Sequence, residues 1–173
     1  MNKIIIGLGN PGEKYKNTRH NAGFLLIDYL IEKFELDKSS KLKNSNFYKL
    51  RNGLVLIRPK TFMNNSGVAA REAIKWFDIN VEEDLIVAHD DLDLPLGKYK
   101  YQFEKSPKDH NGVKSVENHI GTTKFHRLRI GVDNREGRNI DGERYVLKKM
   151  SDQEISVLNS KFSEIIPIFG NLE

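Results

Sequence analysis

The sequence has 173 residues, with 28 lysines and arginines against 24 aspartates and glutamates, so its formal charge is +4. This length suits a single domain, and the mild positive charge is compatible with an RNA partner without requiring one. The sequence contains no cysteine, which excludes disulfides, thiolate zinc sites and a cysteine nucleophile.

The first predicted element is a buried strand at Ile4 to Ile6, which opens into a glycine-rich loop from Gly7 to Gly12. This apolar run is too short for a signal sequence, and no later run approaches the length of a membrane span. We therefore expect a soluble, cytoplasmic protein without membrane contacts. Apolar residues then recur at helical spacing, which predicts an amphipathic helix from Asn21 to Phe34.

Strands and helices alternate along the rest of the chain, after a polar linker at Lys38 to Asn46. The predicted strands are Phe47 to Leu50, Leu54 to Ile57, Leu85 to Ala88, Lys98 to Phe103 and Arg127 to Val132. The predicted helices are Gly67 to Phe77, Val113 to Ile120 and Ser151 to Phe169. Asn52-Gly53 is typical of a hairpin turn between the first two of these strands. The pattern predicts one α/β domain over residues 1–173, a three-layer α/β/α arrangement with a mixed, mostly parallel, twisted sheet.

The glycine-rich loop fits the G-x-G-x-x-G pattern of dinucleotide-binding folds through Gly7, Gly9 and Gly12. That pattern binds a pyrophosphate because a helix begins at the glycines and directs its amides at the anion. Here Pro11 and the polar stretch from Glu13 to Arg19 delay the helix. We therefore reject a dinucleotide site and favour a turn, or a loop that lets Asn10 face a cleft.

A histidine and a carboxylate are the candidate catalytic pair. His20 lies just before the first helix, near the loop that carries Asn10, and an imidazole suits proton transfer at neutral pH. Asp90 directly follows a buried strand, and open α/β sheets bind their ligands at the carboxyl ends of such strands. A carboxylate at that edge could orient the imidazole and stabilise its protonated form. The alternatives are a helix cap for His20 and an acidic turn for Asp90.

A metal site is a further interpretation of the segment His89-Asp90-Asp91-Leu92-Asp93, whose imidazole and carboxylates are all possible ligands. Adjacent residues at a strand end point in opposite directions, so this set does not readily converge on one ion. We therefore predict no metal and no other cofactor.

Asparagines lie at several predicted element boundaries: Asn10, Asn64, Asn65 and Asn111. Each one alone is typical of a turn or a cap. Together with a histidine and a carboxylate, their amides would form a site that binds amide groups and stabilises an oxyanion without a metal.

These residues resemble a family of enzymes, the bacterial-type peptidyl-tRNA hydrolases. The motifs that carry the resemblance are Gly7-Leu8-Gly9-Asn10-Pro11-Gly12, Tyr15, Thr18 to Phe24, Pro59 to Asn64, His89 to Pro95, His110-Asn111-Gly112 and Phe125 to Gly131. They occur in family order between Lys3 and Val132, with a weaker match at Tyr145-Val146-Leu147. The resemblance implies a monomeric, metal-independent carboxylic ester hydrolase that recycles tRNA from prematurely released peptidyl-tRNA.

The resemblance also implies roles for residues of the site. His20 is the expected general base that activates water, and Asp90 is expected to hold its tautomer and favour its protonation. Asn10 would help to distinguish a blocked peptidyl group from a free aminoacyl group. Asn64 and Asn111 would bind the substrate near the ester, and Asn64 would also contact the oxyanion.

For the tRNA end, the resemblance implies aromatic walls at Tyr15 and Phe62, where stacking tolerates any base. The other residues expected to bind substrate are Met63, His110 and Arg129. The expected partner is the acceptor end of peptidyl-tRNA with its peptide, and no obligatory protein partner is expected.

The sequence departs from the family pattern before His110. The family usually has a glycine-rich run there, whereas this chain has Glu104-Lys105-Ser106-Pro107-Lys108-Asp109, and Gln102 stands where a phosphate-binding lysine is common. Lys100, Lys105 or Lys108 are the candidates to compensate. Two alternative functions are a metal-dependent hydrolase and an RNA-binding protein without turnover.

Overall fold

A computed structural model of the chain describes residues 3–170 and 172. These residues form a seven-stranded sheet with the strand order β2-β3-β4-β1-β5-β7-β6. The central strands run parallel to one another: β4 (Val55–Pro59), β1 (Ile4–Gly7), β5 (Leu85–Pro95) and β7 (His126–Asp133). Antiparallel strands flank them: β2 (Ser40–Lys41), β3 (Ser45–Lys49) and β6 (Tyr99–Phe103). The predicted mixed α/β sheet is confirmed, with its parallel pairs in the centre.

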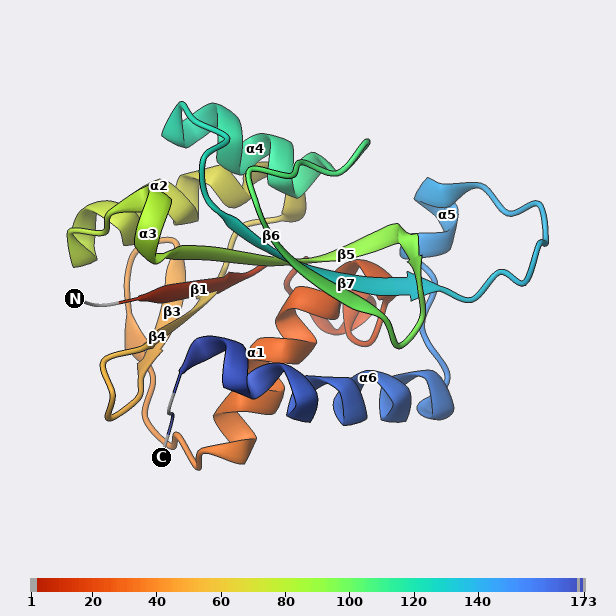
Figure 1. Cartoon of the computed structure of the whole chain (residues 1–173), viewed down its shortest axis with the longest axis horizontal. Coiled ribbons are helices and arrows are strands. Elements are labelled where there is room, and N and C mark those ends of the chain that lie inside the picture. The colour runs from red at the N-terminus through yellow and green to blue at the C-terminus, as the bar shows by residue number, and fades with distance from the viewer. Residues whose placement is uncertain (1–2, 171, 173) are drawn as a thin grey trace.

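Helices cover both faces of the sheet, so the predicted three-layer arrangement is also confirmed (Figure 1). The helices on one face are α1 (Ala22–Lys33) and α6 (Asp152–Ile165), and those on the other are α2 (Ser66–Phe77) and α4 (Asn111–Ile120). Strand β1 shows why both faces are apolar, because Ile5 packs towards α1 while Ile4 and Ile6 pack towards α2. Successive strand side chains point to opposite faces, so a short run of isoleucines serves two cores.

Short helical segments join these elements. They are the α-helices α3 (Val81–Asp84) and α5 (Gly142–Val146) and the 3-10 helices η1 (Glu13–Tyr15), η2 (Arg19–Asn21), η3 (Met63–Asn65) and η4 (Ile166–Phe169). The last of them, η4, lies at the end of the helix that was predicted from Ser151 to Phe169. The others were not predicted as separate elements, because a single turn is too short to show a repeat. Within residues 3–170 and 172, no helix combines the length and apolar character that a bilayer crossing requires.

The long helices and the hairpin begin and end within a few residues of their predicted bounds. Gly53 adopts a φ of 90° between β3 and β4, which is the conformation that the Asn-Gly signal predicted. Ser151 and Glu154 form the predicted capping box of α6. Helix α1 begins at Ala22, well after Gly12, so the late helix start that argued against a dinucleotide site is confirmed.

Two predicted boundaries were wrong. Strand β5 does not end at Ala88 but continues to Pro95, through the polar segment from His89 to Asp93. Residues on other elements pair with the buried carboxylates Asp90 and Asp91, and a window of sequence does not reveal such partners. The segment from Lys38 to Asn46 is not only a linker, because it contains β2, which pairs with β3.

The packing of α1 on the sheet determines where His20 lies. Gly23 is so close to the sheet that a Cβ at this position would come 2.4 Å from the carbonyl oxygen of Ala88. The residues before α1 therefore lie against the carboxyl-terminal half of β5. This is the edge at which open α/β sheets bind ligands.

Candidate active site

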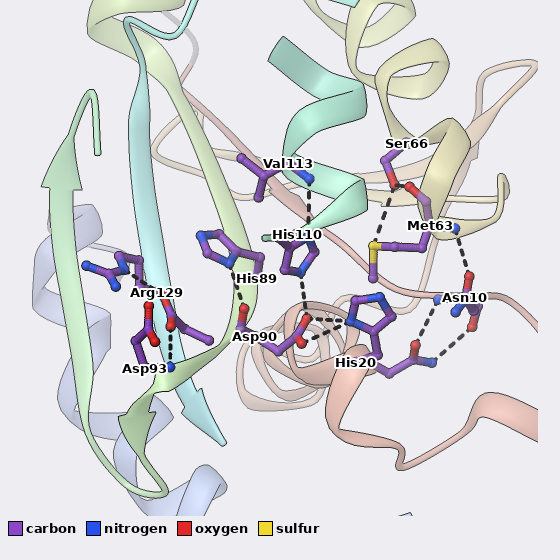
Figure 2. Close-up of polar contacts among 12 residues, drawn as sticks. Asn10, His20, Met63, Ser66, His89, Asp90, Asp93, His110, Val113 and Arg129 are labelled. Atoms are coloured by element: carbon purple, nitrogen blue, oxygen red, sulfur yellow. Dashed lines mark hydrogen bonds and ion pairs between the residues drawn. The ribbon is translucent and has the colours of Figure 1, made fainter. Parts of the chain in front are cut away.

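His20 and Asp90 are hydrogen-bonded at the centre of the candidate site (Figure 2). His20 comes from η2, and its Nδ1 lies 3.0 Å from Asp90 Oδ1 and 2.9 Å from Asp90 Oδ2. An ionised carboxylate only accepts hydrogen bonds, so the Nδ1 of His20 carries a hydrogen and donates it. The other nitrogen, Nε2, then has a free lone pair, and no described residue occupies it. This imidazole is ready to accept a proton.

His110 is a second donor to the same carboxylate. Its Nε2 lies 2.8 Å from Asp90 Oδ1, and its Nδ1 accepts the backbone N–H of Val113 at 3.2 Å. The Val113 N–H therefore fixes the tautomer, because Nδ1 must be unprotonated and Nε2 must carry the hydrogen. His110 is the N-cap of α4, so the start of this helix orients the ring.

The charges of this trio shift the pKa values of two of its members. Burial alone would raise the pKa of the Asp90 carboxyl, but the neighbouring His20 and His110 hold it well below its usual range. Burial alone would lower the pKa of His20, but the charge of Asp90 and the hydrogen bond to it raise the pKa above the ordinary value of 6.5. Asp90 is thus ionised, and His20 is a stronger base than a free imidazole.

The residues on either side of Asp90 point away from His20. The Nδ1–H of His89 donates to the backbone oxygen of Asp90 at 2.8 Å, and burial together with the neighbouring His110 lowers the pKa of His89 to about 3. Asp91 Oδ2 accepts from Arg129 Nε at 2.6 Å. The carboxylates and imidazole from His89 to Asp93 therefore do not converge on one point, as the alternation along a strand predicted.

A different set of metal-ligating groups does converge, namely His20, Asp90 and His110, whose potential ligand atoms lie within 4.8 Å of one another. The nitrogens that face Asp90 both carry hydrogens, however, because Val113 fixes the tautomer of His110 and Asp90 fixes that of His20. A metal ligand needs a free lone pair, so binding would require the Val113 N–H bond to break. The arrangement fits a hydrogen-bonded trio better than a metal centre.

A cavity of about 450 Å³ opens beside the pair His20 and Asp90. His110 and Asn111 line it from the start of α4, so four predicted site residues meet here. The other lining residues come from the end of β5, the segment before α4 and the region of α5: Asp91, Leu92, Asp93, Pro107, Lys108, Asp109, Gly142, Glu143, Val146 and Leu147. The volume suits a substrate group of the size of an amino-acid residue and its neighbours.

Asn10 is buried beside this trio, and Met63 holds its side chain while Asn21 holds its backbone. Its Oδ1 accepts the backbone N–H of Met63 at 2.7 Å. Asn21 clamps its backbone, because Asn21 Oδ1 accepts from the Asn10 N–H at 2.8 Å and Asn21 Nδ2 donates to the Asn10 carbonyl at 2.9 Å. The NH2 of Asn10, which has no partner in the described chain, is left as a donor for a bound molecule.

The remaining predicted site residues lie outside the wall of the cavity. Asn64 follows Met63 in η3 and is exposed. The rings of Tyr15 and Phe62 are in edge-to-face contact at 6.1 Å, and Phe62 is 53% exposed. Arg129 is buried between Asp91 and Gln102, whose Oε1 accepts from its Nη1 at 2.7 Å. The structure therefore brings the two aromatic residues together, whereas the guanidinium of Arg129 is already occupied.

Sequence reasoning assigned no role to Arg19, which fixes the segment that carries His20. Its guanidinium donates to Glu154 of α6 at 2.7 Å, donates to the Lys148 carbonyl at 3.1 Å and lies 4.0 Å from the centre of the Tyr145 ring. These partners are more than 120 residues away in sequence, so no local pattern could have identified them. The only available signal was the position of Arg19 next to His20 within a motif.

The sequence and the structure are similar to one group of known proteins. The sequence model of the peptidyl-tRNA hydrolase family matches residues 4–170. A peptidyl-tRNA hydrolase from Mycoplasma mycoides is 43% identical over 174 residues, which cover 98% of this chain and 91% of that protein. One from Staphylococcus saprophyticus is 44% identical over 161 residues, covering 91% of this chain and 83% of that protein. The crystal structure of peptidyl-tRNA hydrolase from Acinetobacter baumannii aligns with a TM-score of 0.85 at 31% identity, covering 99% of this chain and 88% of that one. The chain therefore belongs to the peptidyl-tRNA hydrolase family.

Proposed function

We propose that this protein hydrolyses the ester bond between the peptide and the tRNA of peptidyl-tRNA, and that His20 is the general base. The observation that carries the proposal is the bond from His20 Nδ1 to the buried, ionised Asp90 beside a cavity, with Nε2 free. Membership of the family supports this substrate. A monomeric state stays a prediction from the resemblance, and a cytoplasmic location stays a prediction from the sequence.

In the proposed reaction, His20 Nε2 accepts a proton from water while the water oxygen attacks the carbonyl carbon of the ester. Asp90 stabilises the resulting imidazolium, and the bond from His110 keeps the carboxylate in place. The bond between the carbonyl carbon and the ribose oxygen then breaks, and the proton on Nε2 passes to that oxygen. The products are a free peptide carboxylate and a tRNA with a free terminal hydroxyl. An ester is labile enough for an oriented water to replace a covalent nucleophile.

Neutral amides around His20 would recognise the peptidyl group. We assign to the NH2 of Asn10 a hydrogen bond to the amide that blocks the substrate nitrogen, and to Asn64 and Asn111 contacts beside the ester, with Asn64 near the oxyanion. Amide groups pair with main-chain donors and acceptors whatever the side chain. Such a site accepts peptides of any sequence, which suits the proposed substrate.

For the tRNA end we keep Tyr15 and Phe62 as the proposed contacts, since the exposed ring of Phe62 and the half-buried ring of Tyr15 can stack on a base. Met63, which is buried, stays a proposed substrate-binding residue. Arg129 is a weaker candidate, because Asp91 already balances its charge. Its proposed contribution is to hold β5 against β6 through Gln102.

The role of Asn10 can be tested with Asn10→Asp. This change keeps the oxygen that accepts from Met63 and replaces only the free NH2 by a charged oxygen. We expect kcat/KM for N-acetyl-aminoacyl-tRNA to fall by about 10- to 100-fold, because a hydrogen bond that involves a charged or buried group is worth roughly 1.5–3 kcal/mol. The ratio of kcat/KM for blocked over unblocked aminoacyl-tRNA should fall more, since a carboxylate attracts the free α-ammonium.

The matched control is Asn118→Asp, which adds the same charge at an exposed position of α4. It should leave both values of kcat/KM unchanged. An unchanged selectivity ratio in Asn10→Asp would remove Asn10 from substrate recognition.

Metal removal gives a separate test. We expect dialysis against EDTA to leave kcat and KM unchanged, because the hydrogen bonds from Val113 to His110 and from His20 to Asp90 leave no free ligand nitrogen facing the carboxylate. The measurement compares turnover before dialysis, after dialysis and after addition of Zn²⁺. Loss of activity that Zn²⁺ restores would instead support the metal-dependent hydrolase.

A further inference from the structure

The side chain of Arg127 on β7 is fully buried, and four oxygens surround it. Its Nη1 donates to the carbonyl oxygens of Thr123 and Phe125, both at 3.0 Å. Its Nη2 donates to Glu117 Oε1 at 2.5 Å and to Ser106 Oγ at 3.1 Å. These four bonds offset the cost of burying the guanidinium, whose Nε has no partner in the described structure. They connect the exposed Ser106 to a cation that is buried in the core.

Ser106 connects this buried cluster to the segment between β6 and α4. Its hydroxyl donates to Glu117 Oε1 at 2.5 Å and accepts from Arg127. No other hydrogen bond from residues 105–109 is present in the described structure. Just before this segment Glu104 adopts a φ of 54°, a left-handed conformation that is unfavourable for a glutamate. Ser106 is thus the side-chain anchor of a segment whose entry is strained.

The residues that follow Ser106 form one wall of the cavity beside His20. Pro107, Lys108 and Asp109 line it, and the next residues are His110 and Asn111 at the start of α4. The wall is therefore held at one end by Ser106 and at the other by the cap of α4. The backbone between these two ends has no hydrogen bond that would keep it in place.

We infer that Ser106 is a positioning residue, which through Glu117 and Arg127 holds the wall from Pro107 to Asp109 in the position that binds peptidyl-tRNA. This inference rests on the proposed function. Within the described residues, no hydrogen bond or ion pair joins the wall to His20 or Asp90, so we expect its position to affect binding of the substrate and not the chemical step. If only a fraction of molecules has the wall in place, the apparent dissociation constant rises by the inverse of that fraction.

Ser106→Ala removes the hydroxyl and leaves the ion pair between Arg127 and Glu117 intact. We expect KM for N-acetyl-aminoacyl-tRNA to rise by about 3- to 10-fold with kcat unchanged, which corresponds to the usual net contribution of one partly exposed hydrogen bond. Ser106→Thr keeps a hydroxyl and should restore the wild-type KM. Ser163→Ala is the matched control, because Ser163 also makes a local hydrogen bond, but on the exposed face of α6.

A second readout follows the wall directly. The chain has no cysteine, so Lys105→Cys gives a single site for a nitroxide label on an exposed residue next to Ser106. We expect the electron paramagnetic resonance spectrum of this label to sharpen in Ser106→Ala and to return to its original width in Ser106→Thr. A wild-type KM in Ser106→Ala, or a fall in kcat at constant KM, would overturn the inference. Wild-type protein without any turnover would overturn the proposed function. In that case the spectra of the label in the wild type and in Ser106→Ala would still show whether Ser106 holds the segment.

Discussion

His20→Ala is expected to lower kcat for N-acetyl-aminoacyl-tRNA by about 100- to 10,000-fold, which is the usual contribution of a positioned general base. The reason is that Nε2 of His20 is the free proton acceptor beside the cavity, while Nδ1 is held by Asp90. KM should change little, because His20 acts on water in the transition state and not on the bound substrate. The measurement is steady-state release of tRNA over a range of substrate concentrations.

The matched control is His119→Ala, which removes an exposed histidine from α4 outside the cavity and should leave kcat unchanged. Circular dichroism and the Tm of His20→Ala should match those of the wild type, so that the loss reflects chemistry. A folded His20→Ala protein with wild-type kcat would show that His20 is not the general base.

Asp90→Asn is expected to lower kcat by a similar factor and to change the pH profile. A carboxylate accepts from both His20 and His110. The amide places an NH2 donor at one of the two oxygens that face the Nδ1–H of His20, and it carries no charge to stabilise the imidazolium. A general base acts only when unprotonated, so wild-type kcat/KM should fall as the pH drops through the raised pKa of His20, above 6.5. Without the charge of Asp90, burial dominates and lowers this pKa. In Asp90→Asn the acidic limb of the kcat/KM profile should therefore move to lower pH, and the plateau value of kcat/KM at higher pH should be smaller.

The pH profile of kcat/KM between about pH 5 and pH 9 measures this shift. Asp37→Asn, an exposed position between α1 and β2, is the control that removes the same charge elsewhere and should leave the profile unchanged. An acidic limb of Asp90→Asn that stays in place or moves to higher pH would show that Asp90 does not raise the pKa of His20.

Much of the fold could be predicted from local sequence, because the apolar pattern alone determines which faces are buried. The isoleucines of β1 and the periodic apolar residues of α1 are examples, and both elements lie where the pattern indicated. The end of β5 could not be predicted in this way. Its buried carboxylates are compatible with a strand because residues of other segments pair with them. His20 and His110 donate to Asp90, and Arg129 donates to Asp91.

The candidate site, like the fold, could be predicted from the sequence only in part. His20 and Asp90 could be proposed because His20 precedes a predicted helix, Asp90 follows a predicted apolar strand, and both match a family motif. The bond from His110 to Asp90 depends on the cap of α4, and the bond from Asn21 to Asn10 joins a loop to η2. These contacts follow from the packing of α1 and α4 on the sheet. Sequence alone suggested His20, Asp90, Asn10 and His110 as candidates, whereas their mutual orientation and the contacts of Asn21 needed the structure.

Release of free tRNA from N-acetyl-aminoacyl-tRNA and from unblocked aminoacyl-tRNA, with EDTA present, tests the central claim most directly. We predict that the wild-type protein cleaves the blocked ester rapidly, leaves the unblocked ester largely intact, and loses the activity in His20→Ala. Folded wild-type protein that binds the blocked substrate without releasing tRNA would contradict the account. That result would favour an RNA-binding protein without turnover.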